Sequence, residues 1–428
     1  MHGGTHVPGI GGSVFQPSLI SWNLTRKCNL KCPHCYLEAG EAADEELTTE
    51  ECHRLIEEFR ELGTEMLILT GGEPLLRRDI YDIASHASQA GMWVVMGTNG
   101  VLVNDHVADK MIECGVKGVG ISIDSVDAAK HNSFRGGPNA WELSVRALDT
   151  CRRKGLEVLV QSTVTSMNTG EIDALISFAK SHGAWSFNLY FLVQTGRGQQ
   201  MNDLGPEETE AILKTLAESQ DAAKPMLVRA KCAPQYKQIA YDLGLGGLES
   251  GGCMAGTEYC RIMPSGDVTP CPYKTVVAGN VRESSFASIW HDSTVFNELR
   301  DTSNLKGRCG RCEFKDICGG CRCRAFAAFG DYLHEDPACN YTPTGRRLET
   351  ATVEWTDPAL ARLERIPIRF IRNKVRKGVE EYARRNGATT VTFALISKAL
   401  AASDRSGSFA SAGDSAPMGF IGKHDRRN

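Results

Sequence analysis

Three cysteines near the start of the chain are the residues with the clearest chemistry. They have the spacing CxxxCxxC and are Cys28, Cys32 and Cys35. An apolar, β-rich run directly precedes them, so we expect the three thiols on one loop at the end of a strand. A 4Fe-4S cube is commonly bound by four thiolates, so three would leave one iron open to bind a small molecule. A structural zinc site is the alternative, because His34 offers a fourth ligand.

A glycine-rich turn, Gly71-Gly72-Glu73-Pro74, follows the next predicted strand. Glycines let a backbone approach a ligand closely, and Glu73 or the neighbouring carbonyls can accept hydrogen bonds from an ammonium group. Together, the two motifs resemble those of the radical S-adenosylmethionine (SAM) superfamily. The resemblance implies that the open iron chelates the methionine end of SAM and that an electron cleaves SAM to a 5′-deoxyadenosyl radical. A low-potential electron donor such as flavodoxin or ferredoxin is then the expected partner.

Polar clusters follow three further predicted strands, at positions 97–100, 122–124 and 161–163. We expect contacts to SAM or to the substrate there, with turn and capping chemistry as the alternative. The candidate residues are Thr98, Asn99, Ser122, Asp124 and Ser162.

A second group of cysteines begins at Cys253 and ends at Cys339, and nine thiols are too many for one metal. Its spacing resembles the SPASM domain, which binds auxiliary 4Fe-4S clusters in radical SAM enzymes. One or two auxiliary clusters are implied. By position, one cluster would use Cys253, Cys260, Cys271 and either Cys321 or Cys323, and the other would use Cys309, Cys312, Cys318 and Cys339.

The stretch CGGCRC departs from the usual SPASM spacing, which leaves the choice between Cys321 and Cys323 open. The remaining cysteines, Cys52, Cys114, Cys151 and Cys232, are isolated in the sequence, and we assign them no chemistry. Isolated cysteines are usually small buried apolar residues.

Three stretches, 188–198, 253–273 and 318–339, resemble the tetrapyrrole-modifying branch of these enzymes, which includes the alternative haem synthase and the haem d1 enzymes. The implied substrate is an iron porphyrin whose propionates are oxidatively decarboxylated. Arg197, in a TGRG loop at a strand end, could pair with a propionate, and a solvated loop arginine is the alternative. Two other functions stay open: a SPASM-type maturase acting on a peptide or protein, and a non-enzymatic iron-sulfur electron carrier.

The elements that position these residues alternate between strands and helices from about residue 18 to 242. Period-two and helical patterns predict strands at 19–25, 65–70, 92–98, 117–123, 156–163, 185–191 and 226–229. Helices should start near Thr48, Asp79, Asn104, Asn139, Gly170 and Pro206. The expected fold class is α/β, a partial (β/α)6 radical SAM barrel, whose chemistry collects at the carboxyl ends of the strands.

Four other segments complete the predicted organisation. Residues 1–17 are an expected flexible N-terminus, and 243–343 form the cysteine-rich SPASM region. Residues 354–402 form a small helical domain, which resembles the C-terminal domain found in the light-independent protochlorophyllide reductase in its WTDP, RIP and VEEYAR pieces. The tail, 403–428, is rich in Ser, Gly and charge and is expected to be disordered.

Composition limits location and partners. The 428 residues carry 48 Lys and Arg against 52 Asp and Glu, so no basic excess indicates nucleic acid as a partner. No run is apolar enough for a membrane span, and no secretory signal is visible. We therefore expect a cytoplasmic protein, in which thiols stay reduced and 16 cysteines indicate metal binding. The substrate, the number of auxiliary clusters, the role of the C-terminal domain and the oligomeric state are not determined by the sequence.

Overall fold

A computed structural model describes residues 15–43, 45–201, 204–245, 252–273, 276–348, 353–366 and 369–406. Most of the predicted flexible N-terminus and of the predicted tail lies outside these ranges. Residue Phe15, inside the predicted N-terminal segment, packs against the main core, and its carbonyl accepts a hydrogen bond from Trp290 Nε1 at 3.0 Å. The last helix continues to Ser406, into the predicted tail.

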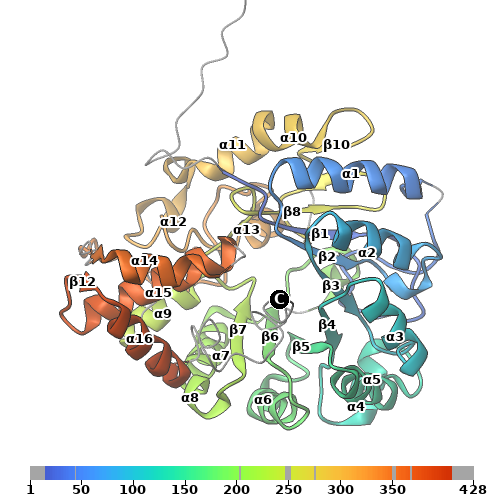
Figure 1. Ribbon diagram of the computed structural model, residues 1–428, viewed down its shortest axis with the longest axis horizontal. Coiled ribbons are helices and arrows are strands. Elements are labelled where there is room, and N and C mark those ends of the chain that lie inside the picture. Colours follow the sequence, from blue (N-terminus) through green and yellow to red (C-terminus); the bar gives the residue numbers. More distant parts are fainter. Residues whose placement is uncertain are drawn as a thin grey trace, which may run out of the picture.

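Seven parallel strands form the barrel wall in the order in which they occur in the chain. They are β1 (Leu19–Asn23), β2 (Met66–Thr70), β3 (Trp93–Thr98), β4 (Gly118–Ser122), β5 (Glu157–Val164), β6 (Ser186–Phe191) and β7 (Leu227–Lys231). Each predicted strand is present, and its ends agree within about two residues. The strands curve around an open interior, with helices on the outside (Figure 1). The predicted partial barrel is therefore confirmed.

The covering helices are α1 (Thr49–Glu61), α2 (Ile80–Gln89), α3 (Asp105–Glu113), α5 (Ala140–Lys154), α6 (Ile172–Ser181) and α7 (Pro206–Glu218). A complete capping box starts α1, in which Thr48 accepts from the Glu51 amide and Glu51 accepts from the Thr48 amide. Asn104 caps α3 through the amide of Val107. Asn139 makes no cap hydrogen bond and has a left-handed backbone. A further helix, α4 (Ala128–Arg135), was not predicted.

The cysteine-rich region extends the barrel sheet, which the sequence did not predict. Strand β8 (Tyr259–Ile262) pairs in parallel with β1, and β9 (Asp267–Thr269) and β10 (Gly279–Asn280) continue the sheet as antiparallel strands. Short helices follow: α10 (Phe286–Asp292), α11 (Thr294–Arg300), α12 (Gly307–Arg311) and α13 (Arg322–Phe329). Two further short helices, α8 (Gln220–Ala223) and α9 (Tyr236–Asp242), flank β7. The second cysteine group is thereby attached to the edge of the barrel beside the first.

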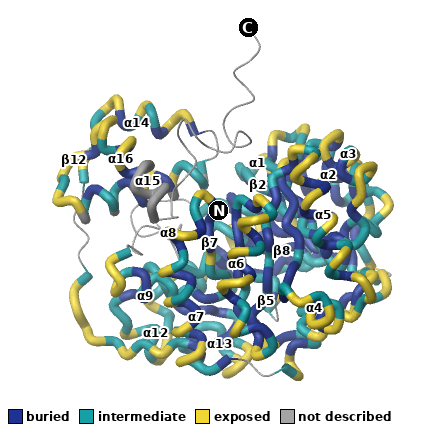
Figure 2. Tube along the Cα trace, turned by 90° about the horizontal axis from the view of Figure 1, so that it is seen from below, coloured by how far each residue is buried: buried dark blue, intermediate teal, exposed yellow. Residues whose placement is uncertain are grey.

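The main apolar core lies between the strands and the outer helices. Side chains alternate along each strand, so Trp22, Val94 and Phe187 face this core and are fully buried. The strands are accordingly dark in Figure 2, whereas the outer faces of the helices are exposed. The other side of each strand faces the barrel interior. There the side chains are mostly polar, as Ser21, Thr70, Gln161 and Tyr190 illustrate.

The C-terminal segment has a small core of its own. It contains β11 (Glu354–Trp355), α14 (Asp357–Glu364), α15 (Arg369–Arg385), β12 (Thr390–Val391) and α16 (Phe393–Ser406), and Val375 and Val379 are buried within it. Its helix α16 packs against α8, and Arg369 pairs with Glu65 of the barrel at 3.3 Å. Among the described residues, no helix has the length and apolarity that crossing a bilayer would require.

Candidate iron-sulfur and SAM site

The loop that carries Cys28, Cys32 and Cys35 follows β1 and is fixed to the rest of the barrel at several points. Its two ends are joined where the amide of Cys28 donates to the carbonyl of Gly40 at 2.8 Å. Arg197 donates from Nε to the carbonyl of Cys32 and from Nη1 to the carbonyl of Ala39, both at 2.9 Å. The three thiols line one cavity inside the barrel, whose empty volume, with its open side, is about 1190 Å³. The structure thus brings together all three predicted ligands of the first cluster.

A buried ion pair lies against this loop. Arg135, at the end of α4, donates from Nε to Asp124 at 2.5 Å, and its Nη1 lies 3.9 Å from Cys32 Sγ. Burial raises the pKa of the Cys32 thiol, and the charge of Arg135 opposes that rise. Asp124 is fully buried and also accepts from the amide of Thr163 at 2.7 Å. Asp124 thus holds the guanidinium of Arg135 near Cys32, at a position where an anionic iron-sulfur cluster would carry thiolate charge.

His34 does not have the surroundings of a typical zinc ligand. Its ring stacks on Phe134 with 4.4 Å between ring centroids, and burial lowers the pKa of His34 to about 3. Among the described residues, no three of Cys, His, Asp and Glu approach closely enough to share a single metal ion. The thiolates of a four-iron cube bind different irons and stand farther apart, so the three cysteines fit a cluster better than they fit zinc.

The turn Gly71-Gly72-Glu73-Pro74 packs directly under the cysteine loop. A Cβ on Gly72 would lie 2.3 Å from the carbonyl oxygen of Lys27, and one on Gly71 would lie 2.6 Å from that of Thr25. The amide of Glu73 donates to the Lys27 carbonyl at 2.8 Å. Gly71 and Gly72 line the cavity, whereas Pro74 is buried behind it. Only glycine allows this approach of the two backbones, which sets the position of the turn relative to the three thiols.

Glu73 is buried and does not line the cavity. Its carboxylate accepts from Thr98 Oγ1 at 2.8 Å and from the Asn99 amide at 2.9 Å. Burial raises the pKa of Glu73 to about 7, although these hydrogen bonds favour the charged form. The geometry makes Glu73 a positioning residue for the end of β3 rather than a direct contact to a ligand in the cavity.

The other predicted strand-end residues divide by the side of the strand that they occupy. Thr98, Asn99 and Ser122 line the cavity. Ser162 and Asp124 do not: Ser162 donates to the carbonyl of Ile123, and Asp124 binds Arg135. Alternation along β5 explains the position of Ser162, because its neighbours Gln161 and Thr163 face the cavity in its place.

Aromatic and cationic residues to which the sequence assigned no binding role also line the cavity. Tyr36, Tyr190, Tyr273 and Arg261 line it. Arg261 is buried and donates from Nη1 to Asn23 Oδ1 at 2.7 Å, and it also bonds the Tyr36 hydroxyl. The Tyr36 and Tyr273 rings lie edge to face, 5.4 Å apart. The sequence could have indicated Arg261 by its position between Cys260 and Ile262 in a short strand. Both neighbours face the apolar core, so Arg261 faces the other side, toward the cavity.

The cysteine-rich region contains one complete set of four thiols. Cys309, Cys312, Cys318 and Cys339 line a single cavity with an empty volume, open side included, of about 370 Å³. These are the four cysteines predicted together as one auxiliary cluster. The guanidinium of Arg322 approaches Cys309 Sγ at 3.5 Å. The donor set and its nearby cation fit an anionic cluster.

The other predicted auxiliary set comes together only in part. Cys271 and Cys323 pack against the buried Cys321, and the charges of Cys321 and Cys253 contribute to raising the pKa of Cys323. Cys260 is in a different environment. It is fully buried in the main apolar core, on the opposite face of β8 from Arg261. The structure does not bring Cys260 to the other predicted ligands.

Three family models match the chain. They are described as "Radical SAM superfamily" for residues 22–179, "Iron-sulfur cluster-binding domain" for residues 253–326 and "Proto-chlorophyllide reductase 57 kD subunit" for residues 355–399. They fall on the barrel, the cysteine-rich region and the C-terminal segment and confirm the three resemblances drawn from the sequence. The first two matches imply 4Fe-4S clusters and SAM as cofactors.

Curated relatives and solved structures agree with these matches. The chain is 41% identical to the "AdoMet-dependent heme synthase" of Methanosarcina barkeri over 340 residues, which are 76% of this chain and 97% of that protein. It is 32% identical to the "Pre-heme d1 synthase" of Dinoroseobacter shibae over 78% of this chain and 89% of that protein. A "PqqA peptide cyclase" of Granulibacter bethesdensis is 28% identical over 79% of this chain and 91% of that protein.

Among solved structures, Streptococcus suis SuiB bound to S-adenosylmethionine has the same fold, with a TM-score of 0.64 and 15% identity over 76% of this chain and 78% of that chain. The matched ranges include the cysteine loop, the glycine turn beneath it and most of the second cysteine group. The chain belongs to the radical SAM superfamily, in the SPASM-domain family that includes the AdoMet-dependent heme synthases.

Proposed function

We propose that the protein oxidatively decarboxylates propionate side chains of an iron porphyrin in haem biosynthesis. The observation that carries this proposal is a group of cationic and aromatic side chains on β6, β7, β8 and adjoining loops, which we call the cationic wall. This wall consists of Tyr190, Arg229, Lys231 and Arg261, together with Tyr36 and Tyr273. The names of haem-related relatives support the same substrate class.

Strand register places the two cations of β7 on the interior face. Lys231 pairs with Tyr190 and Arg229 pairs with Asn188, and paired residues of neighbouring strands share a face. Tyr190 lines the cavity, so Lys231 and Arg229 lie on the same face of the sheet as Tyr190, although neither lines the cavity itself and Arg229 is exposed. Arg229 lies over the Trp185 ring at 5.5 Å. In the part of the chain that the structure describes, neither cation forms an ion pair with a carboxylate, so both are available to carboxylates of a ligand.

The chemistry divides between the cofactors and this chain. When bound, SAM and the first cluster supply a 5′-deoxyadenosyl radical that removes one hydrogen atom from a substrate carbon. The propionate would then lose carbon dioxide and one electron and leave a vinyl group, and an auxiliary cluster held by cysteines of the cysteine-rich region would be able to accept that electron. The hydrogen atom ends in 5′-deoxyadenosine. A low-potential flavodoxin or ferredoxin supplies the electron that cleaves SAM.

The residues of this chain bind and orient the reactants in this scheme. The Asp124–Arg135 pair and Arg197 hold the cysteine loop, while Glu73 holds Thr98 and Asn99 at the edge of the cavity. Arg229, Lys231 and Arg261, on the cationic wall, bind carboxylates of the substrate. Tyrosine rings between the cations offer flat apolar surfaces to a macrocycle. A propionate directed toward the glycine turn would then lie between SAM and the cationic wall.

A peptide maturase is the second candidate, because relatives named for peptide chemistry are also similar to the chain. A peptide substrate would not need an array of cations without acidic partners. The two functions therefore differ in the expected response to removing positive charge from β7.

The experiment supplies anaerobically reconstituted protein with SAM, a reductant and iron-coproporphyrin III deuterated at the propionate β-carbon. We expect the label in 5′-deoxyadenosine and a porphyrin product that has lost carbon dioxide and hydrogen from each processed side chain. Replacing Cys28, Cys32 and Cys35 together by Ala gives the matched inactive control. Unlabelled 5′-deoxyadenosine and an unchanged porphyrin mass, with coproporphyrin and with siroheme-derived substrates, would favour the peptide maturase.

A further inference from the structure

The strand that carries the two interior cations is followed directly by a cysteine in an unusual backbone conformation. Cys232 comes next after Lys231 and has a φ of 60°. Among the described residues, only Glu38 and Asn139 share a positive φ without being glycine. A side chain with a Cβ adopts this region at a cost, and such residues are retained where their surroundings require them. The surroundings of Cys232 must therefore hold its backbone in this conformation.

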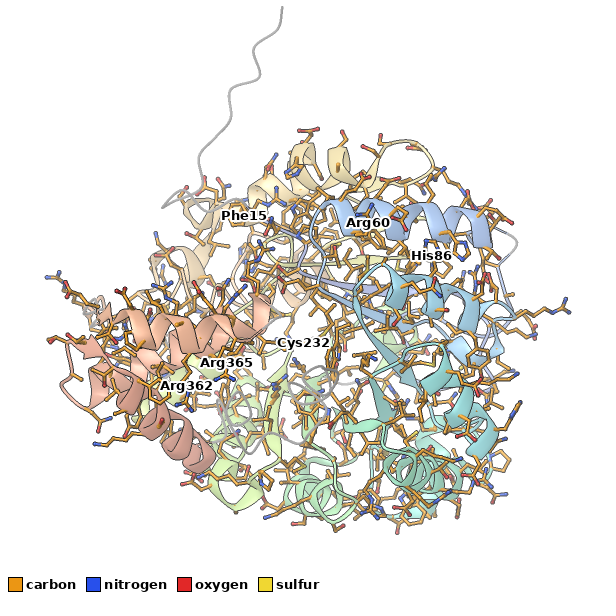
Figure 3. All side chains as sticks on the ribbon, in the orientation of Figure 1. Phe15, Arg60, His86, Cys232, Arg362 and Arg365 are labelled. Atoms are coloured by element: carbon orange, nitrogen blue, oxygen red, sulfur yellow. The ribbon has the colours of Figure 1, made fainter. Side chains whose placement is uncertain are left out.

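Cys232 lies among other thiols that are distant from it in the sequence. Together with Cys271 and Cys323 it packs against a small buried cluster that contains Cys321. Cys253 belongs to the same neighbourhood, since its charge and that of Cys271 contribute to raising the pKa of Cys232, which burial raises most. In Figure 3, Cys232 lies toward the middle of the molecule.

Five thiols therefore form one group, in which Cys232, Cys271, Cys321 and Cys323 pack together and Cys253 lies near them. They come from the end of β7, from the segments before β8 and after β9, and from the start of α13. The carbonyl of Cys232 accepts from Arg324 Nη2 at 3.0 Å, which ties the end of β7 to α13. Arg324 also pairs with Asp336 at 3.2 Å. The loop bearing Cys232 is thus fixed to the helix that bears Cys323.

Cys260 cannot take part in this group without a change of fold. It pairs with Ile20 of β1 in the middle of the sheet, and its side chain is fully buried among apolar residues. Its neighbour Arg261 faces the cavity, so alternation directs Cys260 to the opposite face of the sheet. A four-iron cluster at the five-thiol group therefore needs a ligand other than Cys260.

We propose that Cys232 is a ligand of the auxiliary 4Fe-4S cluster that Cys253 and Cys271 bind together with Cys321 or Cys323. This cluster would then be attached to β7 itself, one residue from Lys231. The cluster would lie nearer to the cationic wall than to the glycine turn. If the proposed function holds, this position makes it, rather than the cluster at Cys309, the acceptor of the electron released on decarboxylation.

The test compares full-length Cys232→Ala and Cys260→Ala after anaerobic reconstitution, by iron content per chain and by electron paramagnetic resonance of the reduced protein. We expect about 12 irons in the wild type, four for each of three clusters. Cys232→Ala should lose about four irons or show an altered signal from one auxiliary cluster. Cys260→Ala should keep both the iron content and the signals of the wild type.

A second variant, Cys232→Ser, distinguishes loss of a cluster ligand from misfolding. Serine keeps the size of the side chain and can still ligate iron. This variant should retain the cluster with a shifted reduction potential. An unchanged iron content and unchanged spectra in Cys232→Ala, or loss of about four irons in Cys260→Ala, would overturn the proposal. Neither readout depends on the substrate, so failure here differs from failure of the porphyrin assay.

Discussion

Arg197 holds Cys32 in place: its Nε donates to the Cys32 carbonyl at 2.9 Å. Its Nη1 fixes the carbonyl of Ala39 at the same distance, and its Nη2 is buried without a hydrogen-bond partner in the described structure. The sequence pointed to this arginine as a propionate ligand. The two carbonyl contacts indicate a different main role, in which Arg197 supports the loop that binds the first cluster.

Arg197→Ala should therefore weaken SAM binding as well as porphyrin binding. Each hydrogen bond to a charged group contributes about 1.5–3 kcal/mol, so SAM affinity should fall by at least about tenfold. Equilibrium binding of SAM to the reconstituted protein measures this. Gln194→Ala is the control from the same segment, since that exposed side chain bonds only the carbonyl of Met201. Normal SAM binding with loss of porphyrin binding alone would restore the propionate role.

Asp124→Ala should destabilise the protein strongly, because it leaves the Arg135 guanidinium buried without its carboxylate. Breaking a buried pair by removing one partner costs about 3–5 kcal/mol. The thermal midpoint of the reconstituted protein reports this loss. Asp105→Ala provides the matched control, because Asp105 pairs with Arg153 on the exposed surface and should have little effect. Equal effects of the two substitutions would mean that the buried pair is not a structural support.

Glu73 should make stability fall as the pH rises. Its pKa is about 7 in the folded protein, above the ordinary carboxyl value, so the folded state binds the proton more tightly than the unfolded state. The cost of ionising Glu73 is absent below about pH 4.5, grows as the pH rises to about 7, and reaches about 3 kcal/mol. Glu73→Gln lacks this titration. The thermal midpoint of the variant relative to the wild type should therefore increase between about pH 5.5 and 8, and a constant difference would contradict the assignment.

Glu73→Gln should also weaken SAM binding at every pH, because one acceptor oxygen becomes an NH2 group, which leaves a single oxygen to accept from the Thr98 hydroxyl and from the amides of Asn99 and Leu75. Thr98→Val removes one of these donors and provides a second variant for comparison. If both variants bind SAM as tightly as the wild type, the end of β3 does not contribute to the SAM site.

The barrel could be predicted from the sequence because its strands are short apolar runs with period two and its helices have clear starts, such as the capping box at Thr48. Strand β8 was missed, since four residues in a cysteine-rich stretch carry too little pattern, and its pairing partner β1 lies far away in the chain. Helix α4 was missed because its sequence, AAKHNSFR, has weak amphipathic character. Its last residue, Arg135, was therefore not recognised as part of the site.

The sequence predicted the grouping of candidate ligands well when those ligands are close in sequence. It predicted the grouping less well when the ligands are far apart in the chain. CxxxCxxC and the four cysteines around Cys309 have local spacing that fixes their roles. The sequence grouped Cys260 with Cys271 and gave Cys232 no role, whereas the structure places Cys232 near Cys271 and Cys260 in the main apolar core. The faces of a strand and a distant loop decide which thiol lies near Cys271, and the sequence pattern shows neither. For the same reason Ser162 was chosen over Gln161 and Thr163.

Removing charge from β7 should weaken binding of an anionic porphyrin without affecting SAM. Arg229→Gln should reduce porphyrin affinity by at least about tenfold if it pairs with one carboxylate, and the loss should shrink at high salt. Titration of the Soret absorbance measures the affinity, and SAM binding is measured in parallel. Arg362→Gln is the control, because Arg362 lies over Phe393 on the C-terminal segment, away from the barrel interior. Unchanged porphyrin affinity in Arg229→Gln would remove the main support for the proposed substrate.

The C-terminal segment should be dispensable for SAM cleavage, because its core is separate from that of the barrel. Its buried residues, among them Val375 and Val379, pack with one another, and its described ion pair to the barrel, between Arg369 and Glu65, is partly exposed. A chain that ends after Pro343 should therefore bind SAM and form 5′-deoxyadenosine at close to the wild-type rate. Arg369→Ala in the full chain should also leave SAM cleavage unchanged. If the shortened chain no longer binds SAM while Arg369→Ala does, the segment supports the barrel through its packing near α8 rather than through this ion pair.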